Sequence, residues 1–109
     1  MANRKVVNSE IKDIVQKYVE HLKSEGIDVV EAILFGSYVH GVPKPWSDID
    51  LCVVSPQFGK DGFEESLRLS KMKYDVDWRI EPHPYSPEGL KEKYDPLADQ
   101  IRKHGIKVA

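Results

Sequence analysis

The sequence predicts a small α/β domain in which helices flank a mixed β-sheet. Three observations support this fold class: segments with helical and strand periodicity alternate along the chain, each segment is short, and glycine or proline separates most of them. At 109 residues the chain fits one domain, residues 1–109, because it is too short to build a second hydrophobic core.

Composition and charge exclude several classes of protein. Hydrophobic residues make up 40% and charged residues 31%, a balance typical of a globular rather than a disordered chain. The net charge of −2 does not favour direct nucleic-acid binding, which usually needs a basic face. No apolar run approaches the roughly 20 residues that span a bilayer, and the first ten residues lack the apolar segment of a secretory signal. We therefore expect a cytoplasmic protein.

The first predicted element is an amphipathic helix. Asn8 or Ser9 can cap its start, and Gly26 suits the position just after its end. Apolar residues recur between these points at spacings of three and four: Ile11, Ile14, Val15, Tyr18, Val19 and Leu22. The helix is expected to pack this stripe against the rest of the domain.

Two strands are predicted around the middle of the sequence. Residues 28–35 form the first, which runs into Gly36 and Ser37 and a short helix to about residue 39 or 40. Residues 41–46 are expected to be loop, since Pro43 and Pro45 cannot continue a helix. In the second strand, residues 47–55, one face carries Ile49, Leu51 and Val53 and the other carries Asp48, Asp50 and the single cysteine, Cys52. That cysteine is expected to be a small buried residue.

The second half of the chain is expected to supply a helix, a strand and a broken helical region. The helix covers residues 63–71, with Phe63 and Leu67 facing inward and Met72 as a further candidate for that face. Residues 74–81 alternate strictly and predict a strand whose inward residues are Val76, Trp78 and Ile80. A proline-rich exit leads at Ser86 to a C-terminal helical region that can break near residue 95 and stops at Gly105.

Carboxylates on these strands raise an electrostatic question. Asp48 and Asp50 point the same way from one strand, with Cα atoms about 6.6 Å apart. Two carboxylates about 4 Å apart repel by about 4 kcal/mol at an effective dielectric of about 20. The next strand adds Asp75, Asp77 and Glu81, any of which could reach the same place. Hard oxygen ligands suit Mg²⁺, and carboxylates around one or two such ions are typical of phosphoryl or nucleotidyl transfer.

The Gly36-Ser37 pair fits the phosphate end of such a site. A glycine after a strand lets the backbone approach a triphosphate, and the serine hydroxyl can donate a hydrogen bond to it. Taken singly, each feature also has a structural interpretation. A Gly-Ser turn is often only a turn, Asp-x-Asp is common on exposed strands, His40 and His83 can serve loop or packing roles, and Arg79 can pair with neighbouring acids.

The combined pattern resembles the signature of the polymerase-β-like nucleotidyltransferase superfamily. The stretch "GSYVHGVPKPWSDIDL" has its Gly-Ser pair, a further glycine and a Ser-Asp-x-Asp-Leu segment, and nearly the whole chain is similar to a minimal nucleotidyltransferase of that fold. The resemblance implies that Asp48, Asp50 and, in "VDW", Asp77 are catalytic metal ligands, with Asp75 and Glu81 as alternatives for the third. It also implies a nucleotide-binding set of Gly36, Ser37 and Ser47, Mg²⁺ as cofactor and ATP as nucleotide donor.

The same resemblance implies a partner. Minimal nucleotidyltransferases are often paired with a small helical HEPN protein as antitoxin and toxin, and some transfer AMP from ATP to a hydroxyl of that partner. Two alternatives stay open: a small-molecule, antibiotic-type nucleotidyltransferase that needs a second subunit or a homo-oligomer, and a catalytically weak antitoxin that neutralises by binding.

Overall fold

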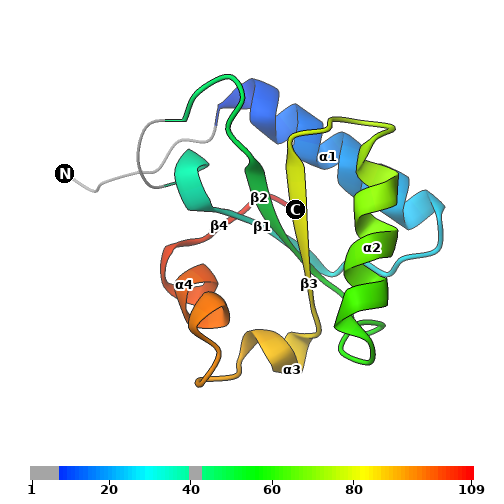
Figure 1. The fold of residues 1–109 in the computed structure, drawn as a ribbon, viewed down its shortest axis with the longest axis vertical. Coiled ribbons are helices and arrows are strands. Elements are labelled where there is room, and N and C mark those ends of the chain that lie inside the picture. The colour runs from blue at the N-terminus through cyan, green and yellow to red at the C-terminus, as the bar shows by residue number, and fades with distance from the viewer. Residues whose placement is uncertain (1–7, 40–42) are drawn as a thin grey trace.

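The structure is a computed structural model, and it describes residues 8–39 and 43–109. Four strands form one sheet with helices on both faces (Figure 1). The elements in order are α1 (Ser9–Ser24), β1 (Glu31–Phe35), the 3₁₀ helix η1 (Gly36–Tyr38), β2 (Ile49–Val54), α2 (Gly62–Lys73), β3 (Ile80–Tyr85), α3 (Pro87–Leu90), α4 (Pro96–His104) and β4 (Ile106–Lys107). The predicted mixed sheet flanked by helices is confirmed. The residues at 40–42, with His40 among them, lie outside the described part.

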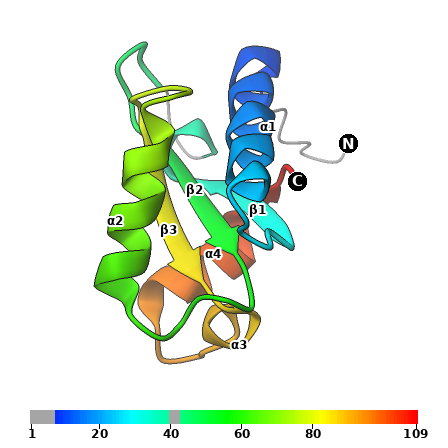
Figure 2. The same cartoon turned by 90° about the vertical axis from the view of Figure 1, so that its right-hand side faces the viewer.

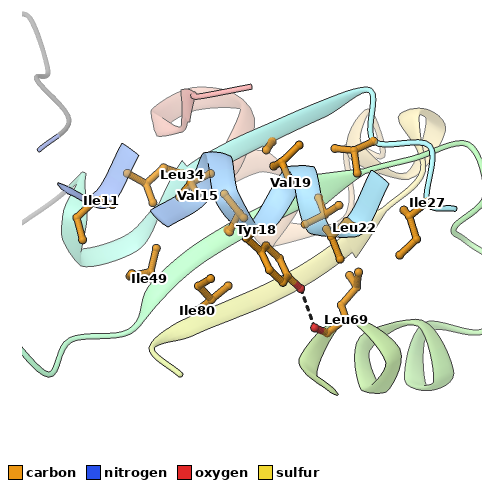
Figure 3. Packing of buried hydrophobic residues seen from close by; sticks show 14 of the residues in the cluster. Ile11, Val15, Tyr18, Val19, Leu22, Ile27, Leu34, Ile49, Leu69 and Ile80 are labelled. Carbon is orange, nitrogen blue, oxygen red and sulfur yellow. Dashed lines mark hydrogen bonds between the residues drawn. The ribbon is translucent and has the colours of Figure 1, made fainter. Parts of the chain in front are cut away.

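Helix α1 forms as its sequence predicts. The side chain of Asn8 accepts a hydrogen bond from the Glu10 amide at 2.7 Å, and Gly26 follows the helix with φ of +89°. Its apolar stripe is buried against the sheet (Figure 3). Within that core the Tyr18 hydroxyl donates to the Leu69 carbonyl oxygen at 2.7 Å, which ties α1 to α2.

The sheet order is β3-β2-β1-β4, with β1 antiparallel to both of its neighbours and β2 parallel to β3. One face packs on α1 and α2 through Ile49, Leu51 and Val53, as predicted. The other face packs on α3 and α4 through Cys52, Val54 and residues of β1, so the two pairs of helices lie on opposite sides (Figure 2). Burial raises the pKa of the Cys52 thiol to about 12, which fits the expected packing role.

The strand predicted at residues 74–81 is wrong in its position. Helix α2 continues to Lys73, and the Val76 and Asp77 amides donate to the Lys73 carbonyl oxygen, so residues 74–79 form turns. Trp78 is consequently 60% exposed instead of buried. The strand β3 begins at Ile80 and runs through the segment that its two prolines had marked as an exit.

The prolines are tolerated because β3 is an edge strand. The Ile49 amide donates to the Arg79 carbonyl oxygen at 2.8 Å, and the Ser55 amide donates to the Tyr85 carbonyl oxygen at 3.0 Å. The backbone N–H and C=O groups of the odd-numbered residues of β3 therefore point toward β2. Pro82 and Pro84 therefore direct their missing N–H groups toward the open edge, where no ladder bond is lost.

The inward face of α2 also differs from the prediction. Phe63 is 75% and Leu67 39% exposed, whereas Leu69 is fully buried and Met72 packs partly against the same core. The apolar residues of this helix cover more than one face, and the tertiary contacts with α1 and β3 select Leu69. The short strand β4, which pairs Ile106 with Leu34 after Gly105, had no counterpart in the prediction.

Candidate active site

Asp50 and Glu81 lie side by side near the start of two parallel strands. The register of β2 and β3 pairs these residues directly, so their side chains leave the same face of the sheet. The Asp50 side chain is 27% exposed, and Glu81 is exposed. Helices α3 and α4 bury the same face farther along β2, at Cys52 and Val54. The two carboxylates thus stand where this face opens to solvent.

Asp48 extends the acidic group by one more position. It is exposed and lies one residue before β2, so in an extended chain its side chain shares the face of Asp50. Among residues 8–39 and 43–109, neither Lys nor Arg makes an ion pair with Asp48, Asp50 or Glu81. Within the same described part of the chain, the basic side chain that lies near these acids is His83, whose Nε2 is 3.6 Å from Asp50 Oδ1.

Gly36 lets the backbone approach these acids. Its φ is +79°, and a Cβ placed on it would lie 2.2 Å from Asp50 Oδ2. No larger residue fits that space while the carboxylate keeps its position, and positive φ is itself unfavourable for other residues. At Gly36 the turn from β1 into η1 therefore lies close against the Asp50 carboxylate. A phosphate-binding turn beside a metal ligand would require such an approach.

The two predicted serines occupy different settings. Ser37 follows Gly36 in η1 and is half-buried. The Ser47 hydroxyl oxygen accepts a hydrogen bond from the Lys44 amide at 2.8 Å, while the Ser47 amide donates to the Lys44 carbonyl oxygen at 2.9 Å. Ser47 thus closes the turn that delivers the chain to Asp48, which gives it a structural task in addition to any contact with a nucleotide.

Asp77, the expected third ligand, does not lie with the other acids in a strand. It precedes β3, and its carboxylate accepts hydrogen bonds from Arg79 Nε at 3.1 Å and Arg79 Nη2 at 3.0 Å. The side-chain hydrogen bonds from Arg79 hold the pKa of Asp77 below its ordinary value, despite an opposing effect of burial. Arg79 also donates to the Pro45 carbonyl oxygen at 3.2 Å, so the pair fastens the loop before β2.

The alternative Asp75 is also engaged elsewhere, since its Oδ2 lies 3.1 Å from His21 Nε2 on α1. Of the three acids left open by the sequence, Glu81 is the one that the sheet register places beside Asp50. The assignment of Asp77 as the third acid stays a prediction that the sheet register does not support, because residues 74–79 form turns and β3 begins only at Ile80.

His83 is a neighbour of this site that the sequence interpretation placed in a loop or packing role. Its Nε2 lies 3.6 Å from Asp50 Oδ1, and its ring meets Phe35 edge-on, with centroids 5.1 Å apart. In a strand, the two-residue spacing of Glu81 and His83 predicts that both side chains lie on one face. Pro82 and Pro84 argue against a strand in the sequence, so this spacing is not recognised there.

The described residues contain no group of three or more His, Cys, Asp or Glu that is arranged as a metal site by itself. The donor set nevertheless fits Mg²⁺, which is commonly bound by one or two carboxylates together with waters and substrate phosphates. Gly36 leaves room for the Asp50 carboxylate, Glu81 stands next to Asp50, and the His83 Nε2 beside Asp50 is buried without a hydrogen-bond partner among the described residues. These residues suit an ion that arrives with a nucleotide.

The fold and the site define a class: small α/β proteins that carry an acidic pair beside a glycine turn. The family model for the nucleotidyltransferase domain matches residues 10–108, and the chain belongs to that family. A curated relative, named "putative protein adenylyltransferase" in Methanocaldococcus jannaschii, is 43% identical over 53 residues, which are 49% of this chain and 60% of that protein. The chain thus matches less than two thirds of that relative's length.

Solved structures share the fold. A nucleotidyltransferase structure from Sulfolobus solfataricus, described as putative, has a TM-score of 0.65 at 16% identity and covers 98% of this chain and 90% of its own. A toxin-antitoxin crystallised with AMP-PNP has a TM-score of 0.58 at 20% identity, and the match covers 90% of this chain and 72% of that one. The toxin-antitoxin MntA-HepT has a TM-score of 0.53 at 17% identity, and the match covers 94% of this chain and 72% of that one.

No helix within the described part of the chain is long and apolar enough to cross a membrane.

Proposed function

We propose that this protein is an Mg²⁺-dependent nucleotidyltransferase that moves AMP from ATP to a hydroxyl group on a partner protein. The partner is a small helical toxin of the HEPN type, and the chain acts as its antitoxin. Asp48, Asp50 and Glu81 hold the metal, with Glu81 taking the place first expected for Asp77. Gly36 and Ser37 receive the triphosphate, and Ser47 supports the turn before Asp48.

The observation that carries this proposal is the in-register pair Asp50 and Glu81 beside Gly36. Like charges directly opposite each other on neighbouring strands destabilise a sheet. Such a pair, beside a glycine whose Cβ would overlap Asp50, supports a site that takes an external cation and a close-lying ligand.

The reaction forms one bond and breaks one. The acceptor hydroxyl oxygen bonds to the α-phosphorus of ATP, the bond from that phosphorus to the bridging oxygen breaks, and pyrophosphate leaves with the electron pair. When bound, Mg²⁺ supplies positive charge that offsets the charge developing on the phosphate oxygens. The exposed Glu81 carboxylate can take the hydroxyl proton, while Gly36, which has no Cβ, leaves room for the Asp50 carboxylate.

A protein acceptor fits the openness of the site. Ligand sites usually bury most of their ligand, but Asp48 and Glu81 are both exposed. A second protein would supply the missing wall and the hydroxyl together. The name of the archaeal relative and the toxin-antitoxin neighbours support this direction.

Label transfer from ATP tests the proposal. The chain is co-expressed with the protein encoded beside its gene, purified, and incubated with Mg²⁺ and ATP labelled at the α-phosphate or, in a parallel reaction, at the γ-phosphate. Only the α-label should reach the partner. Asp50→Asn and Glu81→Gln should each lower the rate about 100-fold or more. Glu20→Gln, which removes an exposed carboxylate on α1, is the matched control and should keep the parent rate. Asp77→Asn is assayed beside it as a folded protein and should keep most of the parent rate, because its carboxylate pairs with Arg79.

The other outcomes separate the alternatives. Label on a small hydroxylated molecule but not on protein would support the antibiotic-type enzyme. Neutralisation of the toxin by the Asp50→Asn and Glu81→Gln variants at full strength would support an antitoxin that acts by binding. Loss of transfer in Asp77→Asn with full activity in Glu81→Gln would restore Asp77 as the third acid.

A further inference from the structure

His83 occupies a place in the sheet that packing alone does not explain. It lies on β3 two residues after Glu81, on the same face, and pairs in register with Cys52 of β2. Its side chain is 29% exposed, and its ring rests edge-on against Phe35 at an interplanar angle of 60°. An apolar ring could make the same contact with Phe35, so the contact does not require an imidazole.

The polar atom of the ring is what requires an explanation. His83 Nε2 is buried and has no hydrogen-bond partner among the residues that the structure describes. Burying an unpaired ring nitrogen is unfavourable, and such groups in native proteins are usually satisfied or used. Asp50 Oδ1 lies 3.6 Å away, beyond a hydrogen bond but close enough that a small shift of either side chain would form one.

Asp50 is therefore confined from two sides. Its Oδ2 faces Gly36, where an added Cβ would approach within 2.2 Å, and its Oδ1 faces His83. We propose that His83 is a positioning residue for the proposed metal ligand Asp50: its Nε2–H donates to Oδ1 and fixes the rotation of the carboxylate, which leaves the remaining lone pairs directed at the ion. Groups that orient metal ligands in this way strengthen metal binding without touching the ion. The inference rests on the proposed function of this site.

A second histidine–aspartate pair provides a control within the same chain. His21 Nε2 lies 3.1 Å from Asp75 Oδ2, and this contact links α1 to the turn after α2. The Asp75 side chain is 71% exposed, and the contact lies apart from Asp50. If any histidine near a carboxylate influenced metal affinity, His21 and His83 would behave alike. Positioning of a metal ligand predicts that only His83 matters.

Mn²⁺ binding tests the inference without relying on activity. Free Mn²⁺ is measured by electron paramagnetic resonance as the ion is titrated into the chain at a fixed, saturating ATP concentration and constant pH. We expect His83→Phe to keep the ring contact with Phe35 and to raise the dissociation constant for Mn²⁺ about tenfold. His83→Gln, which restores an N–H donor at similar reach, should return it close to the parent value, and His21→Phe should leave it unchanged.

The outcomes distinguish this inference from the proposed function. Parent-like Mn²⁺ affinity in a folded His83→Phe variant would overturn the positioning role while leaving the metal site intact. Equal weakening in His83→Phe and His83→Gln would also overturn it, because a donor would then not be the property that matters. If the parent chain binds no Mn²⁺ beyond that bound by ATP alone, the proposed function itself fails, and the positioning role fails with it.

Discussion

Replacing Gly36 by alanine perturbs the proposed site at its tightest point. The added Cβ would lie 2.2 Å from Asp50 Oδ2, whereas ordinary contacts begin at 3.4 Å, so the carboxylate must move by about 1.2 Å. Placing an L-residue at φ of +79° adds a backbone cost of about 1–2 kcal/mol. A misplacement of about 1 Å in a reacting group can cost about 100-fold in rate. We therefore expect Gly36→Ala to lose about 100-fold in AMP transfer.

Gly26 separates the two effects of this substitution. Its φ of +89° is equally unfavourable for alanine, but a Cβ there would meet nothing within 4 Å. Gly26→Ala should therefore lose about 1–2 kcal/mol of stability, or roughly 4 °C or more in Tm, and keep parent activity per folded molecule. Thermal unfolding by circular dichroism measures the first quantity, and α-label transfer under saturating Mg²⁺ and ATP measures the second.

The comparison is decisive because both variants share the backbone cost. Gly36→Ala should resemble Gly26→Ala in Tm, or fall slightly below it, and differ by about two orders of magnitude in transfer rate. Parent-like transfer by folded Gly36→Ala would show that the contact between Gly36 and Asp50 has no part in the chemistry, and the reasoning about this site would be refuted.

Three further predictions concern stability. Leu69→Ala should lower the free energy of unfolding, measured with denaturant, by about 2–5 kcal/mol because Leu69 is fully buried. Phe63→Ala on the same helix should change it by no more than about 0.5 kcal/mol. Similar losses in both variants would contradict the observed orientation of α2. Tyr18→Phe should cost about 1 kcal/mol through the lost bond to the Leu69 carbonyl oxygen, and no loss would show that this bond contributes nothing net. Because Arg79 lowers the folded-state pKa of Asp77, the stability from this pair should be fully present above the ordinary pKa of 3.8 and fade as the pH falls below it. Asp77→Asn should thus be less stable than the parent at pH 6, by a margin that shrinks toward pH 2; a constant margin would contradict this linkage.

Much of the acidic site could be predicted from the sequence because its signals are local. Asp50 lies in β2, where Ile49, Leu51 and Val53 share the opposite face, and Asp48 directly precedes that strand. Gly36 stands at a strand end where a turn is needed. Periodicity of this kind is set by the chain itself. The relation between Gly36 and Asp50 depends on pairing of β1 with β2, and the register, with Phe35 opposite Asp50, followed only from the structure.

The strand that follows α2 is predicted too early in the chain because two structural signals compete. Residues 74–81 alternate as a strand should, yet α2 extends to Lys73 and the next residues fold back on it, which no local pattern showed. The true strand contains Pro82 and Pro84, which normally argue against a strand and are tolerated here at an open sheet edge. Glu81 is a candidate from the sequence alone, but its position beside Asp50 and the position of His83 depend on this edge, which no local pattern shows.

The location of the bound metal shows whether Asp50 and Glu81 form the site. Mn²⁺ with ATP is titrated into ¹⁵N-labelled protein, and the broadening of each amide signal is followed as the ion binds. We expect the amides of Gly36, Asp50 and Glu81 to broaden first, while those of Val54 and Tyr85, about 13 Å farther along the same strands, broaden last. Broadening centred on another part of the molecule, or none at any concentration, would contradict it.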